Sequence, residues 1–253
     1  MVSSIIDKPQ RTAARIAGLA YPISFFIVVA ANFGIFARLI IRGNPAETAR
    51  NILANETLFR IGIAGDILYC VGIVVLLTSL YMILKPVSQN LALVAAFGRL
   101  VHGLTWLVVS LNLFTALRLL NVADYSRALG QDQIPALAAL YLSGSDAYYI
   151  GLLFWGLGAT VCSYLWFKSN YISRALAAFG MISSAWCIAC TFVYYIFPDF
   201  SNVVNLWWFD SPMVVFELVL SFWLLFKGLR PTGIAGPDRA QVGGAWQASG
   251  PDP

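Results

Sequence analysis

Four side chains that can carry charge lie deep inside apolar runs of this sequence. They are Asp66, Arg99, His102 and Glu217. An ionised residue at the centre of a membrane-spanning helix costs about 2.5 to 3.5 kcal/mol, so each of them needs a partner. They can neutralise one another and so fix which helices are neighbours, or they can line a cavity that binds a polar headgroup or relays protons. We favour the first interpretation and keep the second as the alternative.

The spacing of these residues predicts which of them meet. Arg99 and His102 are three residues apart, so they share one helix face, and that face continues through Trp106. Asp66 lies in the preceding apolar run, at a depth of roughly 12 Å from the end of its helix. Two consecutive spans are antiparallel, and we therefore expect Asp66 to contact Arg99 or His102. The sequence leaves open whether Glu217 joins this cluster or rises toward the membrane surface.

The elements that position these residues follow from the composition. The chain of 253 residues is 59% hydrophobic and only 11% charged, far below the roughly 25% charged residues of soluble proteins. Each apolar run is long enough to cross about 30 Å of hydrocarbon as a helix. The sequence therefore predicts an all-α, polytopic six-helix transmembrane bundle, with spans at about 15–40, 58–84, 91–118, 147–167, 174–197 and 212–228.

The two ends of the chain differ in character. Lys8, Arg11 and Arg15 precede the first run as in a signal peptide, but the run is longer than the usual apolar region of about 7 to 15 residues. We predict a retained first helix. Residues 229–253 are rich in Gly, Pro, Ala and Gln and hold too little apolar surface to pack. A six-span domain at 1–228 and a disordered tail at 229–253 are the expected division.

Helix-start signals and small residues refine this outline. Asn44, Pro45 and Glu47 occupy cap, first and third positions, so a short interfacial helix is expected between the first and second spans. Glu56 and Arg60 can pair at a spacing of four. The stretch IPALAALYL, residues 134–142, predicts another surface helix. A narrow seam for close helix contact is expected in the fourth span, formed by Ala147, Gly151, Gly158 and Cys162.

The distribution of Lys and Arg predicts how the chain is oriented in the membrane. The net charge of +4 is scattered over helix ends and forms no stripe, so the expected partner is the lipid bilayer and not nucleic acid. Nine basic residues against six place both termini in the cytoplasm of a cell-membrane protein. One side collects Lys8, Arg11, Arg15, Lys85, Lys168, Arg174, Lys227, Arg230 and Arg239; the other collects Arg38, Arg42, Arg50, Arg60, Arg118 and Arg127.

The sequence lacks the residues that many membrane enzymes need. It holds a single histidine and shows no HExxH, GxSxG or phosphate-binding glycine loop. Cys70, Cys162, Cys187 and Cys190 all fall inside predicted spans, where small apolar packing is their expected role. We therefore expect no cofactor and no metal site, and enzymatic activity is the least supported hypothesis.

Several segments, in order along the chain, carry a family resemblance. They are NPAETARNILANETLFRIGIAGDILY, SLYMILKPV, FGRLVHGLTWLVVSLNL, YYIGLLFWGLG and SYLWFKSNYISRALAAFG. The chain resembles a bacterial family of multi-pass membrane proteins, domain-of-unknown-function family 4386, over about Arg11 to Lys227. The resemblance implies a six-helix integral membrane protein and brings no activity with it.

Two functions remain open at this point. The first is a structural or accessory membrane component whose polar cluster fixes helix packing. The alternative is a carrier or receptor that binds a small amphipathic molecule, or relays protons, through Asp66, Arg99 and His102. A cavity of at least about 300 Å³ that reaches these residues would favour the alternative.

Overall fold

The computed structural model describes residues 6–121, 133–143, 145–197, 199–205 and 207–231, with the side chains of 145, 146, 201 and 207 excepted. These residues are helical and contain no strand. Six helices are long and apolar enough to cross a membrane, as predicted. In chain order the elements are α1 Lys8–Val29, the π-helix η1 Ala30–Phe36, α2 Ala37–Leu39, α3 Pro45–Ala54, α4 Glu56–Leu84, α5 Gln89–Asn121, α7 Gln133–Leu142, α8 Ser145–Ser169, α9 Arg174–Ile196, α10 Phe200–Val203 and α11 Trp207–Phe226.

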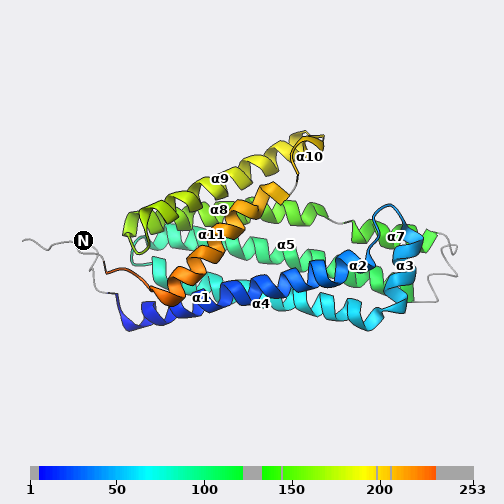
Figure 1. Cartoon of the computed structure of the whole chain (residues 1–253), viewed down its shortest axis with the longest axis horizontal. Coiled ribbons are helices and arrows are strands. Elements are labelled where there is room, and N and C mark those ends of the chain that lie inside the picture. Colours follow the sequence, from blue (N-terminus) through cyan, green and yellow to red (C-terminus); the bar gives the residue numbers. More distant parts are fainter. Residues whose placement is uncertain (1–5, 122–132, 144, 198, 206, 232–253) are drawn as a thin grey trace, which may run out of the picture.

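The spanning helices form a closed ring. Consecutive spans pack side by side, from α1 through α4, α5, α8 and α9 to α11, and α11 returns to contact α1. Figure 1 shows α11 crossing the others obliquely, while α9 diverges from the bundle at the end that carries α10. The crossing is tight near the start of α1: a Cβ atom on Gly18 would lie 2.8 Å from Leu225 Cγ and 3.1 Å from the Ser221 carbonyl oxygen.

The first span begins earlier than predicted, at Lys8 instead of about residue 15. Asp7 is the reason, because its carboxylate accepts a hydrogen bond from the Gln10 amide at 2.7 Å while the Gln10 side chain accepts one from the Asp7 amide at 3.2 Å. This reciprocal cap satisfies two free amides at the helix start. Arg11 and Arg15 consequently belong to the first span and do not precede it.

The predicted interfacial helix is α3. The Asn44 side chain caps it by accepting from the Glu47 amide at 3.1 Å and donating to the Glu47 carboxylate at 2.8 Å. The Glu56–Arg60 ion pair forms at 2.7 Å. The stretch predicted as a second surface helix forms α7, which packs against α3 and α5; its position at the membrane surface stays a prediction. Figure 1 shows α3 and α7 together at one end of the bundle.

The small-residue seam of the fourth span lies against α5. A Cβ atom on Gly158 would meet the Ala95 carbonyl oxygen at 3.0 Å and the Arg99 amide nitrogen at 3.3 Å. Only glycine allows the two backbones to approach this closely. The predicted seam is therefore a helix contact, and it fixes the register of Arg99 relative to α8.

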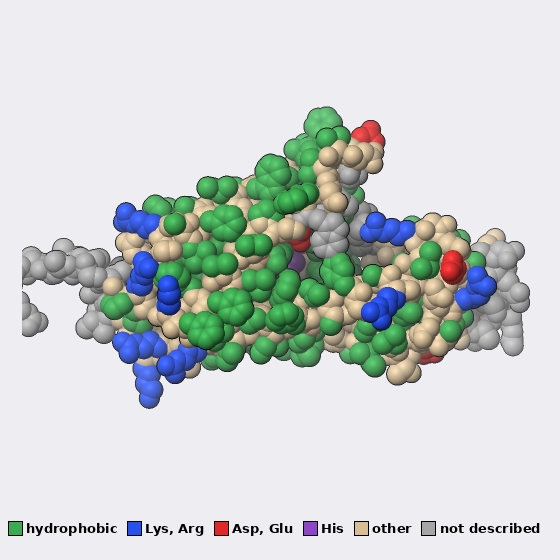
Figure 2. All heavy atoms as spheres, in the orientation of Figure 1, with side chains coloured by type: hydrophobic (Ala, Val, Ile, Leu, Met, Phe, Trp, Pro, Cys, Tyr) green, Lys and Arg blue, Asp and Glu red, His purple; other side chains and the backbone are tan. Residues whose placement is uncertain are grey.

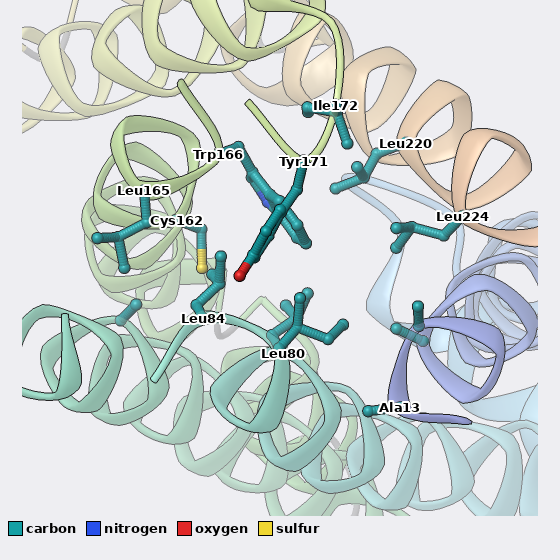
Figure 3. Packing of buried hydrophobic residues seen from close by; sticks show 14 of the residues in the cluster. Ala13, Leu80, Leu84, Cys162, Leu165, Trp166, Tyr171, Ile172, Leu220 and Leu224 are labelled. Atoms are coloured by element: carbon teal, nitrogen blue, oxygen red, sulfur yellow. The ribbon is translucent and has the colours of Figure 1, made fainter. Parts of the chain in front are cut away.

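Near the start of α1 the ring is filled by an apolar cluster that we call the Trp166 core. Figure 3 shows its side chains converging from α1, α4, α8 and α11, with Tyr171 of the α8–α9 link inserted among them. Gln10 donates to the Ile83 carbonyl oxygen at 3.1 Å and to the Tyr171 hydroxyl at 3.4 Å. The labelled members are Ala13, Leu80, Leu84, Cys162, Leu165, Trp166, Tyr171, Ile172, Leu220 and Leu224.

The outer surface suits a lipid solvent. Figure 2 shows apolar side chains over the middle of the bundle and Lys and Arg side chains toward its two ends. Large apolar residues such as Ile182 and Leu68 are exposed on it. Of the predicted tail, Arg230 is held by a hydrogen bond from its amide to the Tyr171 carbonyl oxygen at 2.9 Å. Residues 232–253 lie outside the described residues, so the disorder predicted for them stays a prediction.

Candidate functional site

The four predicted residues all lie inside the ring, on three helices. Asp66 on α4 is fully buried, Arg99 and His102 on α5 are nearly so, and the Glu217 side chain on α11 is 12% exposed. Their grouping differs from the prediction. The expected contact of Asp66 with Arg99 or His102 is wrong, since no ion pair or hydrogen bond joins them within the described part of the chain.

Arg99 pairs instead with Glu217, which the sequence left undecided. The guanidinium donates to Glu217 Oε1 and also to the Tyr21 hydroxyl at 3.0 Å. The Trp155 indole donates to the same carboxylate oxygen at 2.8 Å. These four residues come from α5, α11, α1 and α8, so one charge pair ties four helices together. The prediction failed because α11 folds back onto α1, which brings its carboxylate to the depth of Arg99.

Asp66 has a neutral partner. Asn32 donates to its Oδ1 at 3.1 Å and also to the Val28 carbonyl oxygen at 3.0 Å. Asn32 lies in η1, and π-helical turns of this kind are frequent at functional sites. Asp66 Oδ2 is buried without a hydrogen-bond partner among the described residues. The Trp106 indole nitrogen is likewise buried without a hydrogen-bond partner among the described residues.

Hydrogen bonds hold both ring nitrogens of His102. Nδ1 lies 3.3 Å from the Gly151 carbonyl oxygen, and Nε2 lies 3.2 Å from the Tyr69 hydroxyl. Because a carbonyl oxygen only accepts, Nδ1 carries a hydrogen, whereas the Tyr69 hydroxyl can either donate to Nε2 or accept from it. The His102 ring stacks on Trp155 with 5.3 Å between ring centroids and 25° between planes.

Two matched bridges join α8 to α11. The Tyr148 hydroxyl donates to Asp210 Oδ2 at 2.6 Å, and the Trp155 indole donates to Glu217 at 2.8 Å. On each helix the two residues are seven apart, which is two turns or about 10.5 Å. The same helix faces thus meet at both bridges, and large aromatic side chains span the distance between the helices.

A layer of aromatic rings lies between these bridges. The Trp106 ring meets the Tyr69 ring edge to face at 5.1 Å and the Tyr148 ring at 5.4 Å. Tyr69 also contacts His102. We call the whole assembly the polar chamber. Its members are Tyr69, His102, Trp106, Tyr148, Trp155, Asp210 and Glu217.

The polar chamber is open on one side. Tyr69, Trp106, Tyr148 and Asp210 are only half-buried although they point into the ring. Figure 2 shows a hollow in the middle of this face of the bundle, with red (Asp or Glu) and purple (His) atoms visible near it. His102 is the only histidine of the chain. The space that Arg99 lines on the Trp166 side has a cavity volume of about 0 Å³, so it holds no ligand.

A second hollow lies outside the ring, between α9 and α11. It is an apolar groove of about 420 Å³ that faces the lipid. None of the four predicted residues reaches it. Its lining residues are Phe179, Ile182, Ser183, Trp186, Val204, Trp208 and Pro212.

Metal and thiol chemistry have no organised site in the described residues. No group of three His, Cys, Asp or Glu side chains there is arranged to hold a metal ion. All four cysteines are free and buried. The groups present in the polar chamber are carboxyl groups, hydroxyls, an imidazole and aromatic rings.

Sequence reasoning missed six residues of this region: Tyr21, Asn32, Tyr69, Tyr148, Trp155 and Asp210. A signal for some of them was present. Tyr148 and Trp155 are seven apart, as are Asp210 and Glu217, so each pair marks one face of a helix that carries polar groups. The pairing of the two faces needed the structure.

The ring of six apolar helices with charged and polar groups turned inward defines an integral, multi-pass membrane protein. The chain belongs to the family described as "Domain of unknown function (DUF4386)", whose model matches residues 16–228. This match confirms the predicted family. No curated protein and no solved structure matches the chain.

Proposed function

We propose that this protein is a structural or accessory component of the cell membrane in which the buried polar groups fix helix packing. The observation that carries the proposal is the Arg99–Glu217 pair. Its two side chains are 5% and 12% exposed, and Tyr21 and Trp155 add hydrogen bonds from two further helices. A pair held in this way selects one arrangement of α1, α5, α8 and α11 over others of similar apolar packing.

The proposal is tested by removing the charges singly and together. Arg99→Met leaves the Glu217 carboxylate buried without its cation, and Glu217→Leu does the reverse, so each is expected to cost about 3 to 5 kcal/mol of unfolding free energy. The double variant leaves no lone charge and is expected to recover most of that loss. Denaturant unfolding in detergent micelles, followed by tryptophan fluorescence, measures all three.

The matched control is the exposed Glu56–Arg60 pair, whose side chains are 36% and 49% exposed. Replacing both by alanine is expected to change the unfolding free energy by less than about 1 kcal/mol. If Arg99→Met with Glu217→Leu unfolds the bundle as severely as either single change, the charge pair has a role other than packing and the proposal fails.

A second candidate function is a carrier or receptor for a small amphipathic molecule. The observation that favours it is the hollow of Figure 2, which reaches half-buried polar side chains in the middle of an apolar bundle. A protein that needed polar groups only for packing has no use for such an opening. Binding is favoured over proton relay because no hydrogen bond connects Asp66 to His102 among the described residues.

Access to the polar chamber can be tested without knowing the ligand. Tyr148→Cys is placed in a background whose four native cysteines are replaced by alanine. A small membrane-permeable maleimide is expected to label it, whereas Leu165→Cys in the Trp166 core is expected to stay unlabelled because Leu165 is fully buried. Equal resistance of both positions in folded protein would remove the second candidate.

The location and orientation are part of the proposal. Figure 2 shows Lys and Arg gathered at the end of the bundle where α1 begins, and the positive-inside bias assigns that end to the cytoplasm of the cell membrane. A green fluorescent protein fused to the C-terminus is expected to fluoresce, and an alkaline phosphatase fused there is expected to be inactive. The opposite pattern would reverse the orientation.

A further inference from the structure

Two carboxyl groups in and beside the polar chamber have no cationic partner among the described residues. Glu217 is paired with Arg99, but the partners of Asp210 and Asp66 are the neutral Tyr148 and Asn32. No ion pair joins either aspartate to a Lys or Arg in the described part of the chain. A carboxylate inside a bilayer is stabilised when a cation binds beside it.

The walls of the polar chamber are suited to an organic cation. Tyr69, Trp106 and Tyr148 are half-buried, so parts of these side chains stay accessible. The negative faces of aromatic rings attract ammonium groups, more strongly when water is excluded. Tyr148 holds one ring beside the Asp210 carboxylate through its 2.6 Å hydrogen bond. A ring and a carboxylate therefore lie side by side at the same wall.

An unsatisfied acceptor lies behind this wall. Asp66 is fully buried and its Oδ2 has no hydrogen-bond partner among the described residues. Asp66 and Tyr69 are three residues apart on α4 and so share one helix face. The Asp66 carboxyl group therefore lies one helical turn from a member of the polar chamber.

We propose that the polar chamber binds the ammonium group of an amphipathic organic amine, with the ammonium beside Asp210 and the rings of Tyr148 and Trp106 and the apolar tail directed through the hollow into lipid. The inference rests on the second candidate function, the receptor or carrier. Beyond that function, the inference specifies that the ligand carries a positive charge. Anionic headgroups are disfavoured by the carboxylates, and neutral ones gain nothing from them.

The experiment compares three probes of equal tail length. The full-length protein in lipid nanodiscs is titrated with decyltrimethylammonium, decanol and decanoate, and binding is followed by intrinsic tryptophan fluorescence. Decyltrimethylammonium is expected to bind about tenfold or more tightly than the other two. Asp210→Asn and Trp106→Leu are each expected to lower its affinity by a similar factor, while Tyr148→Phe, which keeps the ring, is expected to change it less.

The control variant is Glu47→Gln, which removes one carboxylate from the exposed start of α3. It is expected to leave the affinity for decyltrimethylammonium unchanged within about twofold, since its charge lies outside the polar chamber. Size-exclusion profiles identify variants that fail to fold, and for those the Tyr148→Phe and Trp106→Leu comparison replaces Asp210→Asn.

The outcomes separate the two levels of the proposal. If decanol or decanoate binds more tightly than the ammonium probe and Trp106→Leu weakens that binding, the receptor function stands and the inference of an amine ligand is wrong. If no probe shows binding that depends on Trp106 or Asp210, both the amine site and the receptor function are overturned. Preferential ammonium binding that depends on Asp210 supports both.

Discussion

The Trp166 core and the polar chamber are built from largely the same helices and differ in how near α11 comes to its neighbours. At the core, the backbone of α11 lies against Gly18 of α1, and apolar side chains fill the ring (Figure 3). At the polar chamber, α11 lies farther from α1 because it runs obliquely across the bundle (Figure 1). There Tyr148 and Trp155 of α8 reach α11 through hydrogen bonds to Asp210 and Glu217.

The comparison shows that one oblique helix separates a closely packed part of the bundle from a part that holds polar and aromatic groups. Close packing at the core needs only small and apolar residues. At the polar chamber two aromatic side chains, Tyr148 and Trp155, span the distance between α8 and α11 and hydrogen-bond the two carboxyl groups of α11. The Arg99–Glu217 pair marks the boundary between the two regions.

The largest expected effect comes from removing a tryptophan from each region. Trp166 is fully buried, so Trp166→Ala is expected to leave a cavity and to cost about 3 to 5 kcal/mol of unfolding free energy. Trp106 is half-buried beside the hollow, so Trp106→Ala enlarges an existing opening and is expected to cost less than about half as much. Unfolding in detergent micelles compares the two. Equal losses would mean that the polar chamber is packed as tightly as the core.

A smaller effect is expected at the helix contact that sets the depth of Arg99. Gly158→Ala places a methyl group 3.0 Å from the Ala95 carbonyl oxygen and is expected to cost about 1 to 3 kcal/mol, because α5 and α8 must move apart. Gly34→Ala is the control, since no atom lies within 4 Å of its added methyl group. If both changes are equally tolerated in thermal unfolding, the α5–α8 seam does not limit the approach of the helices.

Much of the fold followed from the sequence, and the pairing inside it did not. Apolar length predicts six spans, and the Asn44 cap predicts α3, because both are local properties. The burial of Asp66, Arg99 and His102 also followed, since lipid rejects lone charges. Their partners depend on which distant helices meet. Glu217 reaches Arg99 only because the sixth span returns to the first, and no local pattern specifies that return.

The Asn32–Asp66 contact tests the wall of the polar chamber. Asn32→Ala removes the donor to Asp66 Oδ1 and leaves a buried carboxylate without its 3.1 Å hydrogen bond, so a loss of about 1 to 3 kcal/mol is expected. Asn51→Ala is the matched control, because its side-chain bond to the Leu39 carbonyl oxygen is 3.5 Å long and contributes little. Chemical denaturation of both variants measures the two losses of unfolding free energy. A loss no greater than that of the control would show that Asp66 does not depend on Asn32.

The smallest expected effect is at the exposed Glu56–Arg60 ion pair, which provides a reference for the buried Arg99–Glu217 pair. Glu56→Ala breaks a bond of 2.7 Å, close to the ideal length, yet its partner Arg60 is half exposed. Water and salt ions interact with Arg60 once its partner is removed, so the expected loss of unfolding free energy is about 0.2 to 0.5 kcal/mol, and less at high ionic strength. Buried Arg99 has no water or salt ions to interact with when Glu217 is removed. If Glu56→Ala cost as much as breaking the Arg99–Glu217 pair, geometry and not burial would govern both pairs, and the division of the bundle proposed here would lose its physical basis.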